Sequence, residues 1–545
     1  MTAPAAADIA FAGGQRWSRE IAFGSLVTAA VASLLLLAGP APGDAPAHLY
    51  RTFLVRHGVL LWDNLWYAGQ YPLASYSVLY YLPAAVFGNL PLVFGAALVS
   101  TALFASLTLR EWGAAALWPS RVFGVLAAAP LFTGLYAYSL GFATMLGALR
   151  ALQARRTWAA ILLAGLTVGF SPLAFAFLCL ILAALWATRR RVSKRVLAVG
   201  GGLAAIACFE AATLTLFATP GSYPFHAVNF AGVLGVSGLG VLLARRARGG
   251  RQIAAFFALW ALGSVVAFVV RSPLGDNWTR LDAFVFPLML LTASLAGFRP
   301  RRLVTLALTV ALAYNVVPYL LLVPYRLDSR PAHAVFWRPA IAFLRRHSGP
   351  NFRVEVVPTA AHWESYWLPA SGLALARGWY RQIDVADNPM LYRSRLDAAA
   401  YRDWLRANGV EYVLLPATTL DRDGAPLEAR IVRSPSSGLV LVGRDATGNI
   451  YRLPRATPLL TGPGQARLIR VGHTTITGIV SAAGGYLLRV HYNPYWKLHG
   501  TGCVRRGPAR MTLLELSAPG PFSLTVVETA DGLFDAAIVD HDRGC

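Results

Sequence analysis

The sequence predicts a polytopic α-helical membrane protein with a water-soluble C-terminal domain. Its 545 residues are 56% hydrophobic and only 14% charged, whereas soluble domains carry about 25% charged residues. Apolar runs of the length that spans a bilayer, about 17–25 residues, occur only before Val323. Residues 1–323 hold 23 Lys and Arg against 8 Asp and Glu, and residues 324–545 hold 26 against 18. We therefore expect a transmembrane domain over 1–323 and a soluble domain over 324–545.

The transmembrane domain begins with a predicted span from about Ile21 to Leu37, behind Arg16 and Arg19. A basic start, an apolar run and small residues also describe a cleaved signal peptide, but the spans that follow favour a retained helix. Further apolar segments lie near 77–109, 122–149, 157–187, 196–217, 229–244, 252–270, 283–298 and 303–323. Breaks at Gly or Pro, near residues 88–91 and 169–172, indicate hairpins and about eleven crossings in total.

The basic residues of this domain predict its orientation. Seventeen of its 23 cations lie at the N-terminus or in four loops, near 150–156, 189–195, 245–251 and 299–302. Because positive loops stay in the cytoplasm, the loops 38–76, 218–228 and 271–282 and everything after Val323 are expected outside. Most of the excess charge in this domain therefore reports topology, and no aromatic-rich basic patch or helix-turn-helix pattern supports nucleic-acid binding. Of the basic residues other than His, 47 are arginine and only Lys194 and Lys497 are lysine. This bias is typical of a GC-rich bacterial genome, so we expect the protein to lie in a bacterial plasma membrane.

Acidic residues concentrate on the predicted outer face. Four of the eight acids in the membrane half lie there: Asp44, Asp63, Asp276 and Asp282. Carboxylates at a membrane surface are costly unless they are solvated, paired or functional. A helix after Pro46 would place His48 and Arg51 on one face, with Asp44 near its cap. These residues mark the first outer loop as a candidate site.

The same loop continues with aromatic and hydrogen-bonding residues from Trp62 to Pro72, including Tyr67 and Gln70. Sugar rings bind to this mixture, because their apolar faces stack on aromatic rings and their hydroxyls need donors and acceptors. The alternative is the belt of Trp and Tyr that normally lines a membrane interface. The nearby carboxylates and His48 favour a binding site.

The outer loop 271–282 contains Asn277 and Arg280. A guanidinium facing the outer leaflet can hold a lipid phosphate with two parallel hydrogen bonds, as a polyprenyl-phosphate carrier requires. A salt bridge from Arg280 to Asp276 or Asp282 is the structural alternative.

These pieces resemble the GT-C superfamily of membrane glycosyltransferases, and more closely the bacterial multi-spanning proteins of the 6-pyruvoyl-tetrahydropterin synthase-related group. The matching residues are Asp44-x-x-x-His48-x-x-Arg51, Trp62 with Gly69-Gln70-Tyr71-Pro72, Asn277-x-x-Arg280 and Asn493-Pro494-Tyr495-Trp496. No His cluster with metal-ligand spacing supports a pterin-synthase site. The GT-C resemblance implies that an acid of the first outer loop acts as a base or binds a divalent metal such as Mg or Mn. By position that acid is Asp44, with Asp63 second, although the usual paired acids are absent.

The resemblance implies an enzyme that transfers a sugar from a polyprenyl-phosphate donor to an envelope glycan or lipid acceptor on the outer face. Asp44, Asp63 and His48 are the expected catalytic residues, with His48 orienting Asp44 or contacting phosphate. The expected substrate-binding residues are Arg51, Trp62, Tyr67, Gln70, Asn277 and Arg280. A flippase or transporter of lipid-linked sugar and a non-catalytic envelope assembly protein are the alternatives.

The exported domain is predicted to be α+β and to end in a β-rich module. We expect helices over 334–347, starting late because of Pro339, and over 396–408, ending at Gly409. Strands are expected at 353–357, 411–415, 438–443, 466–471, 484–492 and 511–516. No Gly-x-Gly-x-x-Gly follows a strand, which disfavours a nucleotide-sugar Rossmann site.

Three aromatic clusters, 362–367, 377–384 and 491–497, mark the exported domain. They either bind glycan, dock the domain on the membrane site or pack its core. Cys503 and Cys545 are candidates for a disulfide, because an exported domain meets an oxidising compartment.

Overall fold

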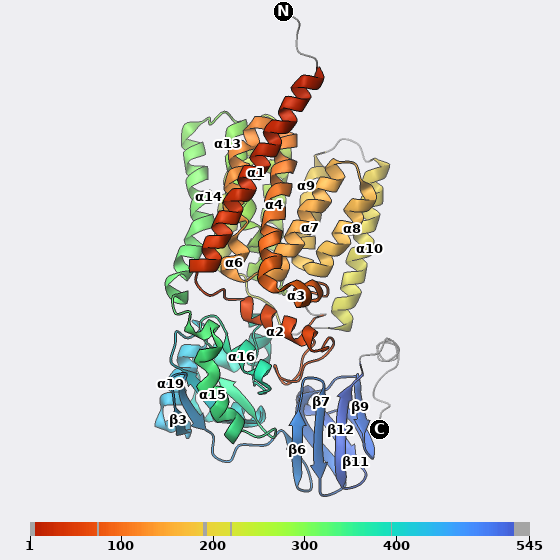
Figure 1. Ribbon diagram of the computed structural model, residues 1–545, viewed down its shortest axis with the longest axis vertical. Helices are drawn as coiled ribbons and strands as arrows, with labels where there is room; N and C mark the ends of the chain where they lie inside the picture. The colour runs from red at the N-terminus through yellow and green to blue at the C-terminus, as the bar shows by residue number, and fades with distance from the viewer. Residues whose placement is uncertain (1–5, 74–75, 189–192, 218–220, 394, 528–545) are drawn as a thin grey trace, which may run out of the picture. The chain divides into compact units, whose positions relative to one another are not determined.

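The computed structural model divides into a helical unit and a mixed α and β unit (Figure 1). It describes residues 6–73, 76–188, 193–217, 221–393 and 395–527. The helical unit comprises Met1–Ala45, Tyr76–Thr215 and Ser222–Pro324. The second unit comprises Pro46–Ser75, Leu216–Gly221 and Tyr325–Cys545. Cys545, the basic run 189–191 and parts of the predicted outer loops 38–76 and 218–228 lie outside the described residues.

The helices of the helical unit follow the apolar segments of the sequence. They are α1 (Ala6–Ala38), α3 (Tyr81–Phe87), α4 (Asn89–Trp112), α5 (Leu117–Leu126), α6 (Ala129–Thr133), α7 (Tyr136–Gln153), α8 (Thr157–Phe170), α9 (Pro172–Ala187), α10 (Lys194–Leu216), α11 (Ala227–Ala244), α12 (Arg251–Val269), α13 (Asp282–Leu295) and α14 (Arg301–Leu322). A 3₁₀ helix, η2 (Gly275–Leu281), leads into α13.

Seven helices or helix runs in the described part of the chain are long and apolar enough to cross a membrane. They are Trp17–Ala38, Asn89–Thr133, Lys194–Leu216, Ala227–Ala244, Arg251–Val269, Gly275–Leu295 and Arg301–Arg326. The helices α8 and α9 are apolar but shorter. The prediction of a helical membrane protein is confirmed at this level.

The predicted breaks occur where the sequence places Gly, Ser and Pro. Gly88 separates α3 from α4 with φ 83°, a left-handed value that glycine tolerates. Ser171 separates α8 from α9, and its side chain accepts a hydrogen bond from the backbone N–H of Ala174 at 3.3 Å. Pro172 then fills the first position of α9, where its missing N–H costs nothing.

Aromatic side chains form the centre of the helical core. The rings of Phe104 and Phe123 stack with centroids 4.0 Å apart, and Phe284 lies 5.1 Å from Phe142 and 5.8 Å from Phe104. These rings come from α4, α5, α7 and α13, so one cluster joins helices that are distant in the sequence.

The second unit contains helix α2 (Ala45–Arg56), whose first residue belongs to the helical unit, and a four-stranded sheet in the order β1-β2-β4-β3. The strands are β1 (Arg353–Val356), β2 (Val410–Pro416), β3 (Val440–Arg444) and β4 (Gly448–Arg452). Its other helices are α15 (Ala334–His347), α16 (Glu364–Trp367), α17 (Arg381–Asp387), α18 (Ala398–Ala407) and α19 (Ala425–Arg433). The expectation of a late start for α15 is wrong, because Pro339 lies inside this helix.

Two further four-stranded sheets form the C-terminal module, in the orders β10-β11-β8-β5 and β6-β7-β12-β9. Their strands are β5 (Leu460–Thr461), β6 (Ala466–Val471), β7 (Thr475–Val480), β8 (Gly484–His491), β9 (Trp496–His499), β10 (Gly502–Arg506), β11 (Met511–Leu516) and β12 (Gly520–Val526). Tyr486 and Leu514 of one sheet and Ile476 and Phe522 of the other belong to one buried core. The module is therefore a β-sandwich, with alternate residues facing inward.

Candidate functional site

The helical unit brings together one residue from each of the two predicted outer loops. The carboxylate of Asp44 lies 3.6 Å from a guanidinium nitrogen of Arg280, and the two side chains are 35% and 23% exposed. The distance is that of an ion pair rather than a short hydrogen bond. Both side chains thus keep part of their surface accessible within the helical unit.

Backbone contacts hold Asp44 at this position. Its N–H donates to the carbonyl of Thr133 at 3.1 Å. Gly134 has φ 89°, and a Cβ there would lie 2.5 Å from the backbone nitrogen of Ala45. Only glycine permits this close approach, so the turn between α6 and α7 sets the place of Asp44.

Arg280 is fixed by two tyrosines. The hydroxyl of Tyr138, in the first turn of α7, donates to the backbone carbonyl of Arg280 at 2.7 Å. The side chain of Arg280 also forms a hydrogen bond with Tyr76. These contacts orient the guanidinium beside Asp44.

The other polar residues of loop 271–282 have partners of their own. Asp276 accepts a hydrogen bond from the backbone N–H of His226 at 2.9 Å, and its other oxygen contacts the His226 ring. Asp282 accepts from the hydroxyl of Tyr319 at 2.9 Å. Asn277 donates to the carbonyl of Pro273 at 3.1 Å within the loop. Arg280 thus pairs with Asp44, while the carboxylates proposed as its alternatives bind elsewhere.

The second unit contains the other predicted site residues of the first loop. His48 is buried in α2. The guanidinium of Arg51 lies 4.2 Å from the centre of the Tyr380 ring and donates to its hydroxyl. Tyr67 accepts a hydrogen bond at its hydroxyl from the Tyr380 backbone N–H at 3.0 Å. The cluster 377–384 therefore contacts two of the predicted substrate-binding residues.

Asp63 and Gln70 pair at the two ends of a short turn segment. Their backbones exchange two hydrogen bonds, of 2.9 and 3.0 Å. Between them the chain takes positive φ at Tyr67, Ala68 and Gly69. The Asp63 side chain is 0% exposed. It accepts hydrogen bonds from the Tyr50 hydroxyl at 2.9 Å and from Nδ1 of His473 at 2.8 Å.

Trp62 lies in an aromatic cluster with the segment 491–497. Its ring centre is 5.0 Å from Tyr71 and 6.3 Å from Trp496. The Tyr71 hydroxyl reaches the side-chain oxygen of Asn493 at 3.5 Å, and the His491 N–H donates to the Ala68 carbonyl at 2.7 Å. The segments 62–71 and 491–497 thus pack against each other within the second unit.

Several buried polar atoms near this turn lack partners within the described ranges. Both amide atoms of Gln70, the side-chain nitrogen of Asn493 and Nε1 of Trp496 make no hydrogen bond there. Buried polar groups are normally paired. These atoms have almost no accessible surface, so the packing at this turn leaves some hydrogen-bonding capacity unused.

A buried charge network in the second unit was not predicted. Arg377 donates to Glu355 and, at 2.6 Å, to Glu428, and it lies 3.5 Å from Asp384. Burial raises the pKa of Glu355 well above its usual value, and the neighbouring Glu428 adds to this effect although Arg377 opposes it. A pattern search misses the network because Glu355 and Glu428 lie in unremarkable strand and helix sequences. Their partner Arg377 is distant in the chain.

His362 and Glu364 lie beside this network. The His362 ring stacks on Trp379 at 3.4 Å, and its Nδ1 is 3.3 Å from Glu364. Burial lowers the pKa of His362 well below its usual value, with help from Arg381. Burial also raises the pKa of Glu364 to about 8. Both shifts favour the neutral forms of the two side chains, so the contact is not a salt bridge between charged groups.

The GT-C resemblance allows a divalent metal, which would require suitable side-chain ligands. Among the residues that the structure describes, no group of three His, Cys, Asp or Glu side chains is placed to hold a metal ion. The charged neighbour of Asp44 is Arg280, which repels a cation. The donor set around Asp44 therefore does not fit a divalent ion. A scan of family models and a search of curated proteins find no match to this chain.

Proposed function

We propose that this chain is a membrane glycosyltransferase that moves a sugar from a polyprenyl-phosphate donor to an envelope glycan or lipid acceptor. The observation that carries the proposal is the 3.6 Å ion pair between Asp44 and Arg280. In this proposal Asp44 is the base and Arg280 is the phosphate-binding group. A pair of this kind provides both charges that the reaction needs.

The proposed reaction uses Asp44 as a general base. Its carboxylate takes the proton of the acceptor hydroxyl while the acceptor oxygen bonds to the anomeric carbon of the donor. The bond between that carbon and the phosphate oxygen breaks, and the polyprenyl phosphate leaves with the bonding electrons. Arg280 stabilises the negative charge of the leaving phosphate through charge-assisted hydrogen bonds. Tyr138 and Tyr76 hold Arg280 in place for this role.

The second unit is proposed to recognise the carbohydrate acceptor. Trp62, Tyr71 and Trp496 supply ring faces and edges. Gln70 supplies both of its amide atoms, and Asn493 its side-chain nitrogen, without a partner in the described residues. This combination of aromatic rings and amides suits sugar rings and their hydroxyls. The non-catalytic assembly hypothesis rests on the same residues but assigns no role to Asp44.

The finer features of the architecture belong to the same proposal. They are a GT-C-like arrangement with about eleven crossings, a cytoplasmic N-terminus and a C-terminal domain outside a bacterial plasma membrane. The basic loops of the membrane half support this orientation through the positive-inside rule. Cys503 and Cys545 are proposed to pair outside the cytoplasm.

The proposal is tested by supplying membranes that contain the full chain with a panel of radiolabelled polyprenyl-phosphate hexoses and pentoses. The expected product carries the label in a new glycosidic bond, identified by glycosidase digestion and mass spectrometry. Label that crosses the membrane while still attached to the polyprenyl carrier would instead identify a flippase. Arg280→Gln should lose product formation, whereas Arg271→Gln, in the same loop, should retain it.

A further inference from the structure

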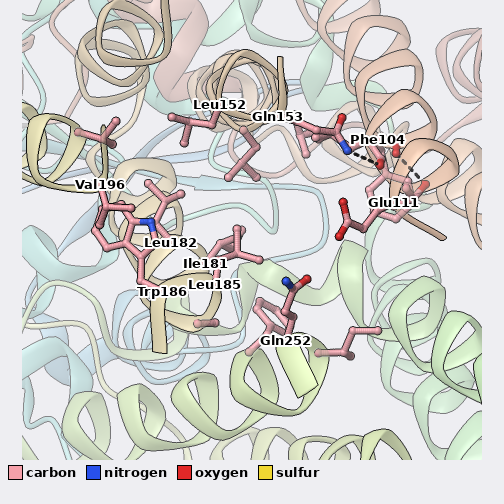
Figure 2. A pocket seen from close by; sticks show the side chains of 18 of the residues that line it. Phe104, Glu111, Leu152, Gln153, Ile181, Leu182, Leu185, Trp186, Val196 and Gln252 are labelled. Carbon is pink, nitrogen blue, oxygen red and sulfur yellow. Dashed lines mark hydrogen bonds between the residues drawn. The ribbon is translucent and has the colours of Figure 1, made fainter. Parts of the chain in front are cut away.

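A cavity of about 700 Å³ lies within the helical unit (Figure 2). Its lining comes from the ends of α7, α9, α10 and α12 that join the predicted cytoplasmic loops, from the C-terminal end of α4, and from α13. Pockets that bind small molecules measure about 300–1,000 Å³, so the cavity is large enough for a ligand.

The cavity is distinct from the Asp44–Arg280 pair. The helix α7 contacts both: Tyr138 near its start bonds to Arg280, and Gln153 at its end lines the cavity. At 1.5 Å per residue, these two positions are about 22 Å apart along the helix axis. The cavity mouth is therefore at the opposite end of α7 from the proposed reaction site.

The helices α4, α7, α10 and α12 each line the cavity with apolar residues and with a polar residue near the helix end. On α4, Phe104 and Leu107 precede Glu111, at the spacing of one helix face. On α12, Gln252 precedes Phe256, again with the polar residue at the helix end. This polarity gradient matches an amphiphile whose hydrocarbon chain enters and whose headgroup stays at the mouth.

The polar mouth contains both charge signs and free hydrogen-bonding groups. Arg155 and Arg195 are positive, and Glu111 is negative. Figure 2 shows the Glu111 carboxylate and the Gln252 amide turned toward the open space. Gln153 donates to the Leu107 carbonyl at 3.1 Å, and its buried side-chain oxygen has no partner in the described part of the chain.

We propose that this cavity binds one acyl chain of a phospholipid with a phosphoethanolamine headgroup. The arginines pair with the phosphate. The primary ammonium donates hydrogen bonds to Glu111 and to the free oxygen of Gln153. A phosphocholine headgroup has the same phosphate but no N–H, so the mouth distinguishes the two.

The packing of α10 gives the lipid a path from the bilayer. Val199 and Leu203 are the buried residues among the described positions of this helix, and Val199 lines the cavity. The other positions of α10 are exposed or half-buried, so this helix is the side of the cavity where the second acyl chain can stay in the bilayer.

The test uses the purified full-length protein in detergent, incubated with an equimolar mixture of phosphatidylethanolamine and phosphatidylcholine that have identical acyl chains. Native mass spectrometry counts the lipid that is retained. We expect about a tenfold preference for phosphatidylethanolamine, the factor that one charge-assisted hydrogen bond supplies. Glu111→Gln should reduce that preference, because it removes the carboxylate and leaves only neutral acceptors for the ammonium. Equal retention of the two lipids by the wild-type protein would overturn the proposal.

Two matched pairs on α10 separate the cavity from lipid bound at the surface. Val196→Trp fills the cavity and should lose the retained lipid, while Leu197→Trp, at a residue 65% exposed, should keep it. Arg195→Gln should weaken retention of both lipids, and Lys194→Gln, which does not line the cavity, should not. If neither Val196→Trp nor Arg195→Gln differs from its control, the lipid lies outside the cavity and the proposal fails. Arg195→Gln decides the outcome if the Trp variant does not fold.

Discussion

His473 donates a hydrogen bond from Nδ1 to the buried carboxylate of Asp63 at 2.8 Å. The bond joins the turn between β6 and β7 to the segment 46–73. Asn64 strengthens the connection, because its N–H donates to the His473 carbonyl at 2.8 Å and its side chain donates to Gly472. A segment that lies among apolar runs in the sequence is thus part of the unit that carries the β-sandwich.

Removing His473 should destabilise the second unit. His473→Ala leaves Asp63 buried with one fewer donor, at an expected cost of about 1–3 kcal/mol. His499→Ala is the control, because His499 is exposed and contacts only Thr525 among the described residues. Thermal unfolding followed by tryptophan fluorescence measures the difference. Equal melting temperatures for the two variants would contradict a structural role for the Asp63–His473 bond.

Arg377 is predicted to be essential for the fold of the second unit. Arg377→Met leaves Glu355, Glu428 and Asp384 buried without their cation, which costs about 3–5 kcal/mol. Arg406→Met breaks only an exposed pair with Asp403, worth less than about 1 kcal/mol. Chemical denaturation of the purified variants compares them. A similar loss of unfolding free energy in both variants would mean that the buried network contributes no more to stability than a surface ion pair.

Glu364 predicts a pH dependence of stability. Its pKa is about 8 in the folded protein against a usual 4.5. The folded state therefore holds a proton that the unfolded state releases as pH rises above 4.5. This group stabilises the fold at low pH, and its contribution falls by up to about 1.4 kcal/mol per pH unit between 4.5 and 8. Melting temperatures over that range should decline less steeply for Glu364→Gln than for the wild type, and parallel profiles would refute the assignment.

Gly69 is expected to be the least replaceable residue of the turn in the first loop. It has φ 114°, and a Cβ would lie 2.3 Å from the Trp62 ring. Gly58 also has positive φ, 74°, but open space around it. Gly58→Ala measures the backbone strain alone, about 1–2 kcal/mol, and Gly69→Ala should cost more. Limited proteolysis within 46–73 reports the effect. Equal protection of the two variants would show that the Trp62 contact is unimportant.

Local patterns predicted much of the secondary structure. The strands expected at 466–471 and 511–516 have those bounds as β6 and β11, because alternating apolar residues face one sandwich core. Gly409, with φ 68°, follows α18 as expected of a residue that ends a helix. The strands β4, β5, β7, β9, β10 and β12 were not predicted. For β5 and β9, two to four residues carry too little periodicity.

The partners of the site residues were less predictable. The composition indicated that Asp44 and Arg280 are unusual for a membrane surface, but it did not predict that they form an ion pair. It also marked Trp62 and Trp496 separately without indicating their contact. His473 gave no signal, because a single histidine in a turn acquires its role only when Asp63 folds against it. Long-range contacts of this kind have no local pattern in the sequence.

The central claim is tested most directly by the rate of sugar transfer in Asp44→Asn. This change keeps the side-chain size and removes the carboxylate that would accept the proton. Asp276→Asn is the matched control, because Asp276 pairs with His226 rather than with Arg280. The account predicts that Asp44→Asn, expressed and folded as the wild type, loses at least about 100-fold in transfer rate while Asp276→Asn stays near the wild-type rate. Full transfer activity in Asp44→Asn would contradict it.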